Sequence, residues 1–205
     1  MIELNISRAV SALKNGDIIV YPTDTLYGLG ADINNDDAVR KVFEVKKRPF
    51  NDPLSVAVSD FAELEKIADA DERTRKLVKQ FLPGKLTLIL KKKESISDMV
   101  TGGLGKVAIR IPNNKIALEI LTSFGPITAT SANIHGLKTP YIINEINMQL
   151  KENVAVYLDN GRLKGQPSTI VELTDNQVKI VRKGAIPEKD ISDAILNGWW
   201  DLWKI

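Results

Sequence analysis

The chain of 205 residues contains no cysteine and a single histidine, His135. The lack of cysteine excludes disulfides, thiolate nucleophiles, iron–sulfur clusters and cysteine-type zinc sites. One histidine cannot form a facial metal triad, so a transition-metal enzyme is not expected, whereas carboxylate-bound magnesium stays open. Chemistry in this chain therefore relies on hydroxyl, amide, carboxylate and cationic side chains, and the missing cysteine favours a cytoplasmic location.

Long apolar runs and a strong net charge are also missing. No run of about 18 apolar residues occurs, and the first residues carry no basic flank before an apolar stretch, so we expect neither a signal peptide nor a membrane span. Lys and Arg number 28 against 26 Asp and Glu, a formal net charge of +2. Because no overall field attracts nucleic acid or membranes, any anion site must be a local cluster of cations.

Hydrophobic residues make up 43% and charged residues 26% of the chain, which is typical of a globular protein with a sizeable core. We expect one domain over residues 1–205, with a core at about 3–184 and a C-terminal helix and tryptophan-rich tail at about 185–205. The tail holds Trp199, Trp200 and Trp203. We expect it to dock on the core, with a subunit contact or a lid as the alternative.

Short β-rich runs alternate with helical patterns, which is typical of an α/β domain. Because the last strands follow one another closely, we expect a mixed sheet with flanking helices. The expected strands cover 17–21, 54–58, 86–90, 107–111, 127–130, 155–158, 169–173 and 178–181, and the expected helices 6–13, 36–46, 59–67, 71–82, 115–122, 143–151 and 188–196. Asp36 or Asp37 is the expected cap of the second helix.

The segment at 21–31, YPTDTLYGLGA, places hydroxyls, a carboxylate and two glycines directly after an apolar strand. We expect it to form a turn. Ligands bind at the carboxyl ends of strands in open α/β sheets, although turn formation alone explains Pro, Thr, Asp and Gly equally well.

Cations recur at three further places. Lys46 and Arg48 end a helix just before Pro49, and they either form an anion clamp or simply complement the helix dipole. Arg110 lies on the face of a strand opposite its large apolar residues, and Arg182 also lies in a strand pattern. Each of these two arginines is either an exposed side chain or a residue that binds a ligand.

Small polar side chains gather in two loops. One follows the strand at 127–130 and holds Ser131, Asn133 and Thr139, and the other precedes the strand at 169–173 and holds Ser168. Such groups fix the orientation of a ligand, but they also cap helices and turns. His135 is interpreted as a surface residue.

In this order, the segment at 21–30, Lys46-x-Arg48-Pro49, Arg110, Ser131-x-Asn133, Ser168-Thr169 and Arg182 resemble the successive motifs of the YrdC-type threonylcarbamoyl-AMP synthases. The resemblance implies a twisted mixed sheet around a large, basic-lined cavity. It also implies a nucleotidyltransferase that makes threonylcarbamoyl-AMP and pyrophosphate from L-threonine, bicarbonate and ATP, with Mg²⁺. The product serves threonylcarbamoyladenosine formation at tRNA position 37, through a separate transferase complex.

The resemblance also implies roles for individual residues. Lys46 and Arg48 would be catalytic. ATP would be bound by Arg48, Asp52, Lys106, Ser131, Asn133, Thr139 and Arg182. L-threonine would be bound by Thr23, Thr25, Arg110, Ala129 and Ser168.

The chain departs from the family pattern at two positions, where many relatives carry Asn and His and this chain has Asp52 and Ala57. Asp52 would repel a triphosphate unless magnesium or Lys47 intervenes. The alternatives are an RNA-binding module, with weak RNA binding at this net charge, and a YciO-like paralogue that acts on another nucleotide or carbamate.

Overall fold

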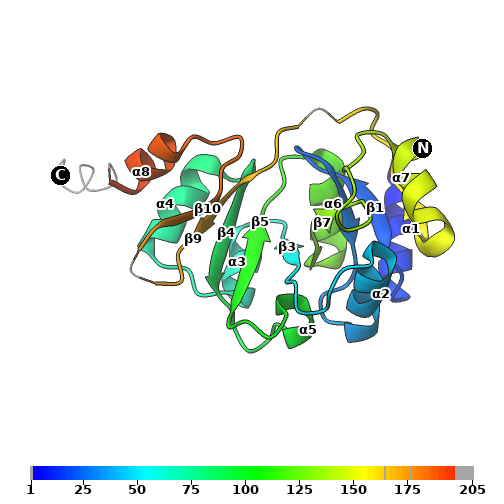
Figure 1. Ribbon diagram of the computed structural model, residues 1–205, viewed down its shortest axis with the longest axis horizontal. Helices are drawn as coiled ribbons and strands as arrows, with labels where there is room; N and C mark the ends of the chain where they lie inside the picture. The colour runs from blue at the N-terminus through cyan, green and yellow to red at the C-terminus, as the bar shows by residue number, and fades with distance from the viewer. Residues whose placement is uncertain (1, 164, 176, 197–205) are drawn as a thin grey trace.

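The computed structural model describes residues 2–163, 165–175 and 177–196, so the tryptophan-rich tail expected after the last helix lies outside the described residues. Two sheets lie next to one another along the long axis of the molecule (Figure 1). One has the strand order β7 (Thr130–Ser131), β2 (Tyr27–Gly30), β1 (Ile19–Pro22) and β8 (Val156–Tyr157). The other has the order β10 (Lys179–Arg182), β9 (Thr169–Glu172), β4 (Leu86–Lys91), β5 (Lys106–Arg110), β3 (Ser55–Ala57) and β6 (Ile127–Thr128).

Both sheets are mixed. β1 and β8, β3 and β5, and β4 and β9 are parallel pairs, and the other pairs are antiparallel. The mixed α/β architecture is therefore confirmed, with its strands divided between two sheets.

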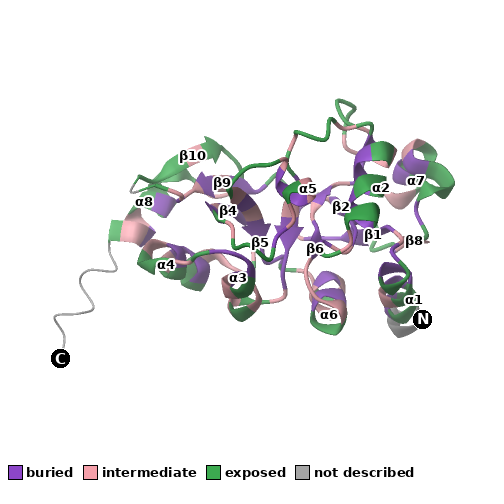
Figure 2. Cartoon of the chain, turned by 90° about the horizontal axis from the view of Figure 1, so that it is seen from below, coloured by how far each residue is buried: buried purple, intermediate pink, exposed green. Residues whose placement is uncertain are grey.

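Helices flank the strands. They are α1 (Ile2–Lys14), α2 (Asp36–Lys46), α3 (Phe61–Ile67), α4 (Glu72–Phe81), α5 (Asp98–Thr101), α6 (Lys115–Phe124), α7 (Ile143–Leu150), the 3₁₀ turn η1 (Lys151–Asn153) and α8 (Glu188–Leu196). Figure 2 shows α1, α3, α4 and α6 in a row along one side of the buried strands. Among the described residues no helix has the length and apolar character needed to cross a membrane.

The second helix begins and ends as the pattern predicted, but its cap was wrong. Asn35 is the N-cap, and its side chain accepts hydrogen bonds from the backbone N–H groups of Asp37 and Ala38. Asp36 and Asp37 instead occupy the first turn, where carboxylates interact favourably with the helix dipole. The helix ends at Lys47 in the left-handed conformation, which directs the following loop toward β3.

The expectation of a turn over residues 21–31 was wrong for its second half, because Tyr27–Gly30 form strand β2 against β1. Tyr27 and Leu29 are fully buried. The two glycines of this strand allow the ring of Tyr21 to pack over it, since a Cβ on Gly28 would lie 2.9 Å from the Cε1 atom of Tyr21. These glycines therefore have a packing role in addition to any role in ligand binding.

Thr128 joins the two sheets. This residue of β6 is fully buried, and its hydroxyl donates to the carbonyl of Leu29 (2.9 Å) and accepts from the N–H of Ala31 (3.0 Å). Its backbone N–H also donates to the carbonyl of Ala31 (2.9 Å), and its carbonyl accepts from the hydroxyl of Tyr21 (3.1 Å). The end of β2 is thereby held against the other sheet.

Replacing Thr128 by valine keeps the side-chain volume but leaves the buried N–H of Ala31 without its hydroxyl partner and removes the bond to Leu29. We expect the free energy of unfolding to fall by about 2 to 4 kcal/mol, the cost of two unsatisfied buried polar groups. Chemical denaturation measures this change. The control, T122V on the exposed surface of α6, should stay within about 0.5 kcal/mol of wild type, and an equal effect of the two substitutions would contradict the role given to Thr128.

Candidate active site

A cavity of about 550 Å³ lies between the two sheets and the loops that follow β1, α2 and β7. Ten of the residues predicted from the sequence line it: Thr23, Thr25, Arg48, Asp52, Arg110, Ala129, Ser131, Thr139, Ser168 and Arg182. They come from segments far apart in the chain, and the fold brings them together. Three arginines and several hydroxyl side chains line the cavity together with apolar residues.

Arg110 lies at the end of β5, on the cavity face of the sheet, and is 7% exposed. Its Nη2 donates to Oδ1 of Asp24 (2.6 Å) and its Nη1 donates to the hydroxyl of Thr25 (2.9 Å). The Nε atom of Arg110 and Oδ2 of Asp24 are both buried without a hydrogen-bond partner. A guanidinium has five N–H donors, so Arg110 keeps donors for an anion in the cavity.

Thr23 shapes the loop that carries these partners. Its hydroxyl accepts from the N–H groups of Thr25 (3.1 Å) and Leu26 (3.2 Å) and donates to the carbonyl of Leu26 (2.6 Å). It also lies 3.0 Å from the hydroxyl of Thr25. Two hydroxyls and one guanidinium thus face the same part of the cavity.

Arg182 and Ser168 form the neighbouring part of the wall. Arg182 donates from Nε and Nη2 to the carbonyl of Ser168 (3.2 and 2.9 Å) and from Nη2 to its hydroxyl (3.1 Å). Burial, and then the positive charge of Arg110, lower the pKa of Arg182. The two guanidinium groups are therefore close enough to repel, and an anion between them would relieve this repulsion.

Arg48 is held by its own loop. Its Nε donates to the carbonyl of Asp52 (3.1 Å), and its Nη2 donates to the carbonyl of Pro53 (2.9 Å) and pairs with the Asp52 carboxylate (3.0 Å). Ser131 and Thr139 face the same cavity from the loop after β7. This part of the cavity can bind a second anion at Arg48. The hydroxyls of Ser131 and Thr139 can form hydrogen bonds with uncharged groups of the same ligand.

Lys46 and Asn133 do not line the cavity but lie behind its wall. Lys46 is 1% exposed, and its Nζ donates to the backbone carbonyls of Ser131 and Asn133, the latter at 2.7 Å. Asn133 accepts from the Ser131 hydroxyl (2.5 Å) and donates to the carbonyls of Ile134 and Leu137 (both 2.8 Å). Both side chains therefore fix the loop that presents Ser131.

Lys106 also lies away from the cavity. It is the first residue of β5, whereas Arg110 is the last, and its Nζ pairs with the carboxylate of Glu172 (2.6 Å). Its side chain is therefore not placed with the predicted nucleotide ligands.

The sequence reasoning missed several lining residues. Thr87 lies 2.8 Å from the Ser168 hydroxyl, and Ile89, Ile170 and Val181 add apolar surface beside it. The signal for Thr87 was present, because it is the polar residue in the apolar run of 86–90 and shares a strand face with Ile89. Ala57 is fully buried in a cluster with Tyr21 and is not among the lining residues.

Comparison with known proteins agrees with this geometry. Residues 11–184 match the family model Sua5_yciO_yrdC, described as "Telomere recombination". The chain belongs to the Sua5/YciO/YrdC family. A relative in Methanocaldococcus jannaschii, named putative threonylcarbamoyl-AMP synthase, is 43% identical over 176 residues, which cover 85% of this chain and 83% of the relative. The threonylcarbamoyl-AMP synthase of Bacillus subtilis is 38% identical over 194 residues, 93% of this chain and 56% of that one.

Solved structures of the family have the same fold. The Pyrococcus abyssi Sua5 complexed with L-threonine superposes with a TM-score of 0.90 at 35% identity, over 95% of this chain and 58% of that one. The Escherichia coli YciO superposes with a TM-score of 0.85 at 29% identity, over 93% of this chain and 94% of that one. The chain thus spans a little over half the length of the Bacillus and Pyrococcus relatives.

Lys46 gives the site a pH dependence of stability. Burial, and then the charge of Arg48, lower the pKa of Lys46 from 10.5 to about 7. Between these values the unfolded chain binds more protons than the folded chain, so stability rises with pH in this window. We expect the free energy of unfolding of the wild type, relative to K46M, to increase by about 2 to 4 kcal/mol from pH 7 to pH 10.

Chemical denaturation at pH 7, 8.5 and 10 measures this change. The matched control is K47M, which removes the same charge at the adjacent, exposed position and should keep a constant difference from wild type. A constant difference for K46M as well would contradict the lowered pKa.

Proposed function

We propose that this chain is a threonylcarbamoyl-AMP synthase that forms threonylcarbamoyl-AMP and pyrophosphate from L-threonine, bicarbonate and ATP. The observation that carries the proposal is one cavity lined by three arginines, Arg48, Arg110 and Arg182, which together can bind more than one anion. The names of the relatives and the L-threonine complex of the Pyrococcus protein support it.

The proposed reaction needs no nucleophilic side chain. The threonine amine and bicarbonate combine with loss of water to form a carbamate. One carbamate oxygen then attacks the α-phosphorus of ATP, forming an O–P bond while the bond to the β-phosphate oxygen breaks and pyrophosphate leaves. The protein has to hold two anions together and stabilise charge at phosphorus, and arginines are suited to both tasks.

The proposal assigns the groups as follows. Arg110 takes the threonine carboxylate through the donors that Asp24 and Thr25 leave unused, with the hydroxyls of Thr23 and Ser168 beside it. Arg48 and Arg182 take the phosphates, and Ser131 and Thr139 orient the nucleotide. Lys46 and Asn133 act through the loop they hold.

Magnesium enters this proposal with ATP, as part of the substrate. Within 2–163, 165–175 and 177–196 no group of three His, Asp or Glu side chains is placed to hold a metal ion. Asp52 nevertheless lines the cavity beside Arg48. One carboxylate together with phosphate oxygens and water fits the usual surroundings of Mg²⁺ at nucleotide sites.

By the same proposal the reaction takes place in the cytoplasm, and the adenylate passes to a transferase that modifies tRNA at position 37. The short lifetime expected of a mixed carbamic–phosphoric anhydride supports direct use by a second enzyme.

The direct test incubates the purified chain with ATP, Mg²⁺, bicarbonate and L-threonine and follows products by mass spectrometry and pyrophosphate release. We expect threonylcarbamoyl-AMP and pyrophosphate, and neither when any one of the three substrates is omitted. Nucleotide binding without product would contradict the proposal and favour a YciO-like activity on another substrate.

Two substitutions separate the subsites. R110A should raise the KM for L-threonine and R48A the KM for ATP, each lowering kcat/KM about 30- to 900-fold because a charged contact in the transition state is lost. Steady-state kinetics with one substrate varied at a time measures this. R40A, which removes an exposed arginine on α2, should match wild type. Full activity of both R48A and R110A would contradict the assignment.

A further inference from the structure

Asp52 places a negative charge beside the arginine that faces the proposed phosphate subsite. Its Oδ2 lies 3.0 Å from Nη2 of Arg48 and 3.9 Å from Nδ1 of His135. The pair is partly exposed, with 18% of the Arg48 side chain and 39% of the Asp52 side chain accessible, and both residues line the cavity. A phosphate that approaches Arg48 therefore also approaches a carboxylate.

The loop fixes this arrangement. The Nε and Nη2 atoms of Arg48 bond the backbone carbonyls of Asp52 and Pro53, and the N–H of Asp52 bonds the carbonyl of Pro49 (3.0 Å). Since the backbone of the same loop holds the guanidinium, Arg48 cannot leave Asp52 without giving up these bonds.

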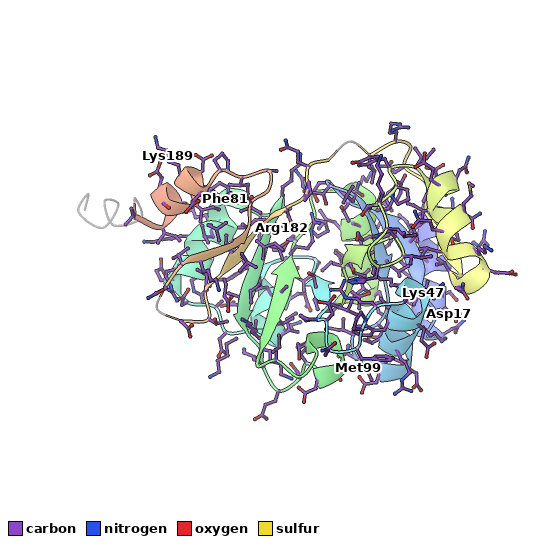
Figure 3. The ribbon with its side chains drawn as sticks, in the orientation of Figure 1. Asp17, Lys47, Phe81, Met99, Arg182 and Lys189 are labelled. Carbon is purple, nitrogen blue, oxygen red and sulfur yellow. The ribbon has the colours of Figure 1, made fainter. Side chains whose placement is uncertain are left out.

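The neighbouring lysines do not offset the carboxylate. Lys46 is turned toward the carbonyls of Ser131 and Asn133. Lys47 lines a separate groove with Val45 and Met148, and Figure 3 shows it at the end of α2, in the other half of the molecule from Arg182. Among the described residues the ion-pair partners of Asp52 are Arg48 and His135 and neither lysine. Of the two ways to reconcile Asp52 with a triphosphate, a neighbouring lysine and a divalent cation, this leaves the cation.

We propose that Asp52 makes this cavity selective for nucleotide that carries a divalent cation, by repelling metal-free phosphate from Arg48 and by serving as the protein ligand of the cation. The inference rests on the proposed function for the presence of nucleotide. The inference goes beyond the proposed function in two respects. It states that the metal-bound form of the nucleotide binds, and it names Asp52 as the residue that determines this selectivity. Carboxylate and phosphate oxygens are the ligands that Mg²⁺ prefers, and partly exposed unlike charges near 3 Å still interact measurably.

The experiment measures equilibrium binding of α,β-methylene-ATP, which cannot release pyrophosphate, by calorimetry in Mg²⁺ and in EDTA without threonine. The wild type should bind at least about tenfold more tightly with Mg²⁺, the size of one such charge interaction. In D52N, metal-free binding should tighten about tenfold and the effect of Mg²⁺ should fall below about threefold. D52E, which restores the charge, should restore the preference for metal.

The matched control is D17N, which removes a carboxylate paired with Lys41 (3.4 Å) outside the cavity lining. It should bind the analogue as wild type does in both buffers. Circular dichroism of each variant confirms that binding is compared between folded proteins, and D52S removes the carboxylate in a second way if D52N is unstable, with the same expected results.

The metal itself gives a second readout. Electron paramagnetic resonance of Mn²⁺ with the analogue should show protein-bound Mn²⁺ for wild type and D17N and at least about tenfold weaker retention for D52N. Equal affinity of the wild type in Mg²⁺ and EDTA, or an unchanged Mg²⁺ effect in D52N, overturns this inference and leaves the proposed function standing. Failure of the folded wild type to bind the analogue in either buffer overturns both.

Discussion

Three arginines that face one cavity have to be held together against their mutual repulsion, and the site is built around this constraint. Each guanidinium is fixed by oxygen atoms of a nearby loop: Arg48 by Asp52 and Pro53, Arg110 by Asp24 and Thr25, and Arg182 by Ser168. Because these bonds exist before any ligand enters, the cations are already oriented toward the cavity. Pre-oriented charge is what stabilises charge that develops in a transition state.

The same constraint explains how a chain with a net charge of +2 contains a basic site. Asp24 is almost as buried as its partner Arg110, with 9% and 8% of their side chains exposed. A buried guanidinium without such a partner would be strongly destabilising. The acidic residues of the site are therefore as necessary to it as the arginines, and the overall composition cannot reveal either.

Local pattern predicted the elements well where local forces decide them. The helix at 36–46 has the predicted bounds, and the alternation along β5 placed Arg110 on the face now seen to form the cavity. It could not predict that Tyr27–Gly30 would be a strand, because that depends on the ring of Tyr21 packing over glycines. Nor could it place Lys46, since the carbonyls that bind its ammonium lie 85 and 87 residues further along.

The net charge of the side chains around the cavity indicates whether the substrates bind with or without a metal ion. The three guanidinium groups and the carboxylates of Asp24 and Asp52 leave one net positive charge around the cavity. A metal-free triphosphate and an amino-acid carboxylate would bring about five negative charges to it, whereas Mg²⁺ removes two of them. At an effective dielectric constant near 20 each uncompensated pair at 4 Å costs about 4 kcal/mol. A cavity that carries carboxylates among its arginines is therefore suited to anions that arrive with their own cation.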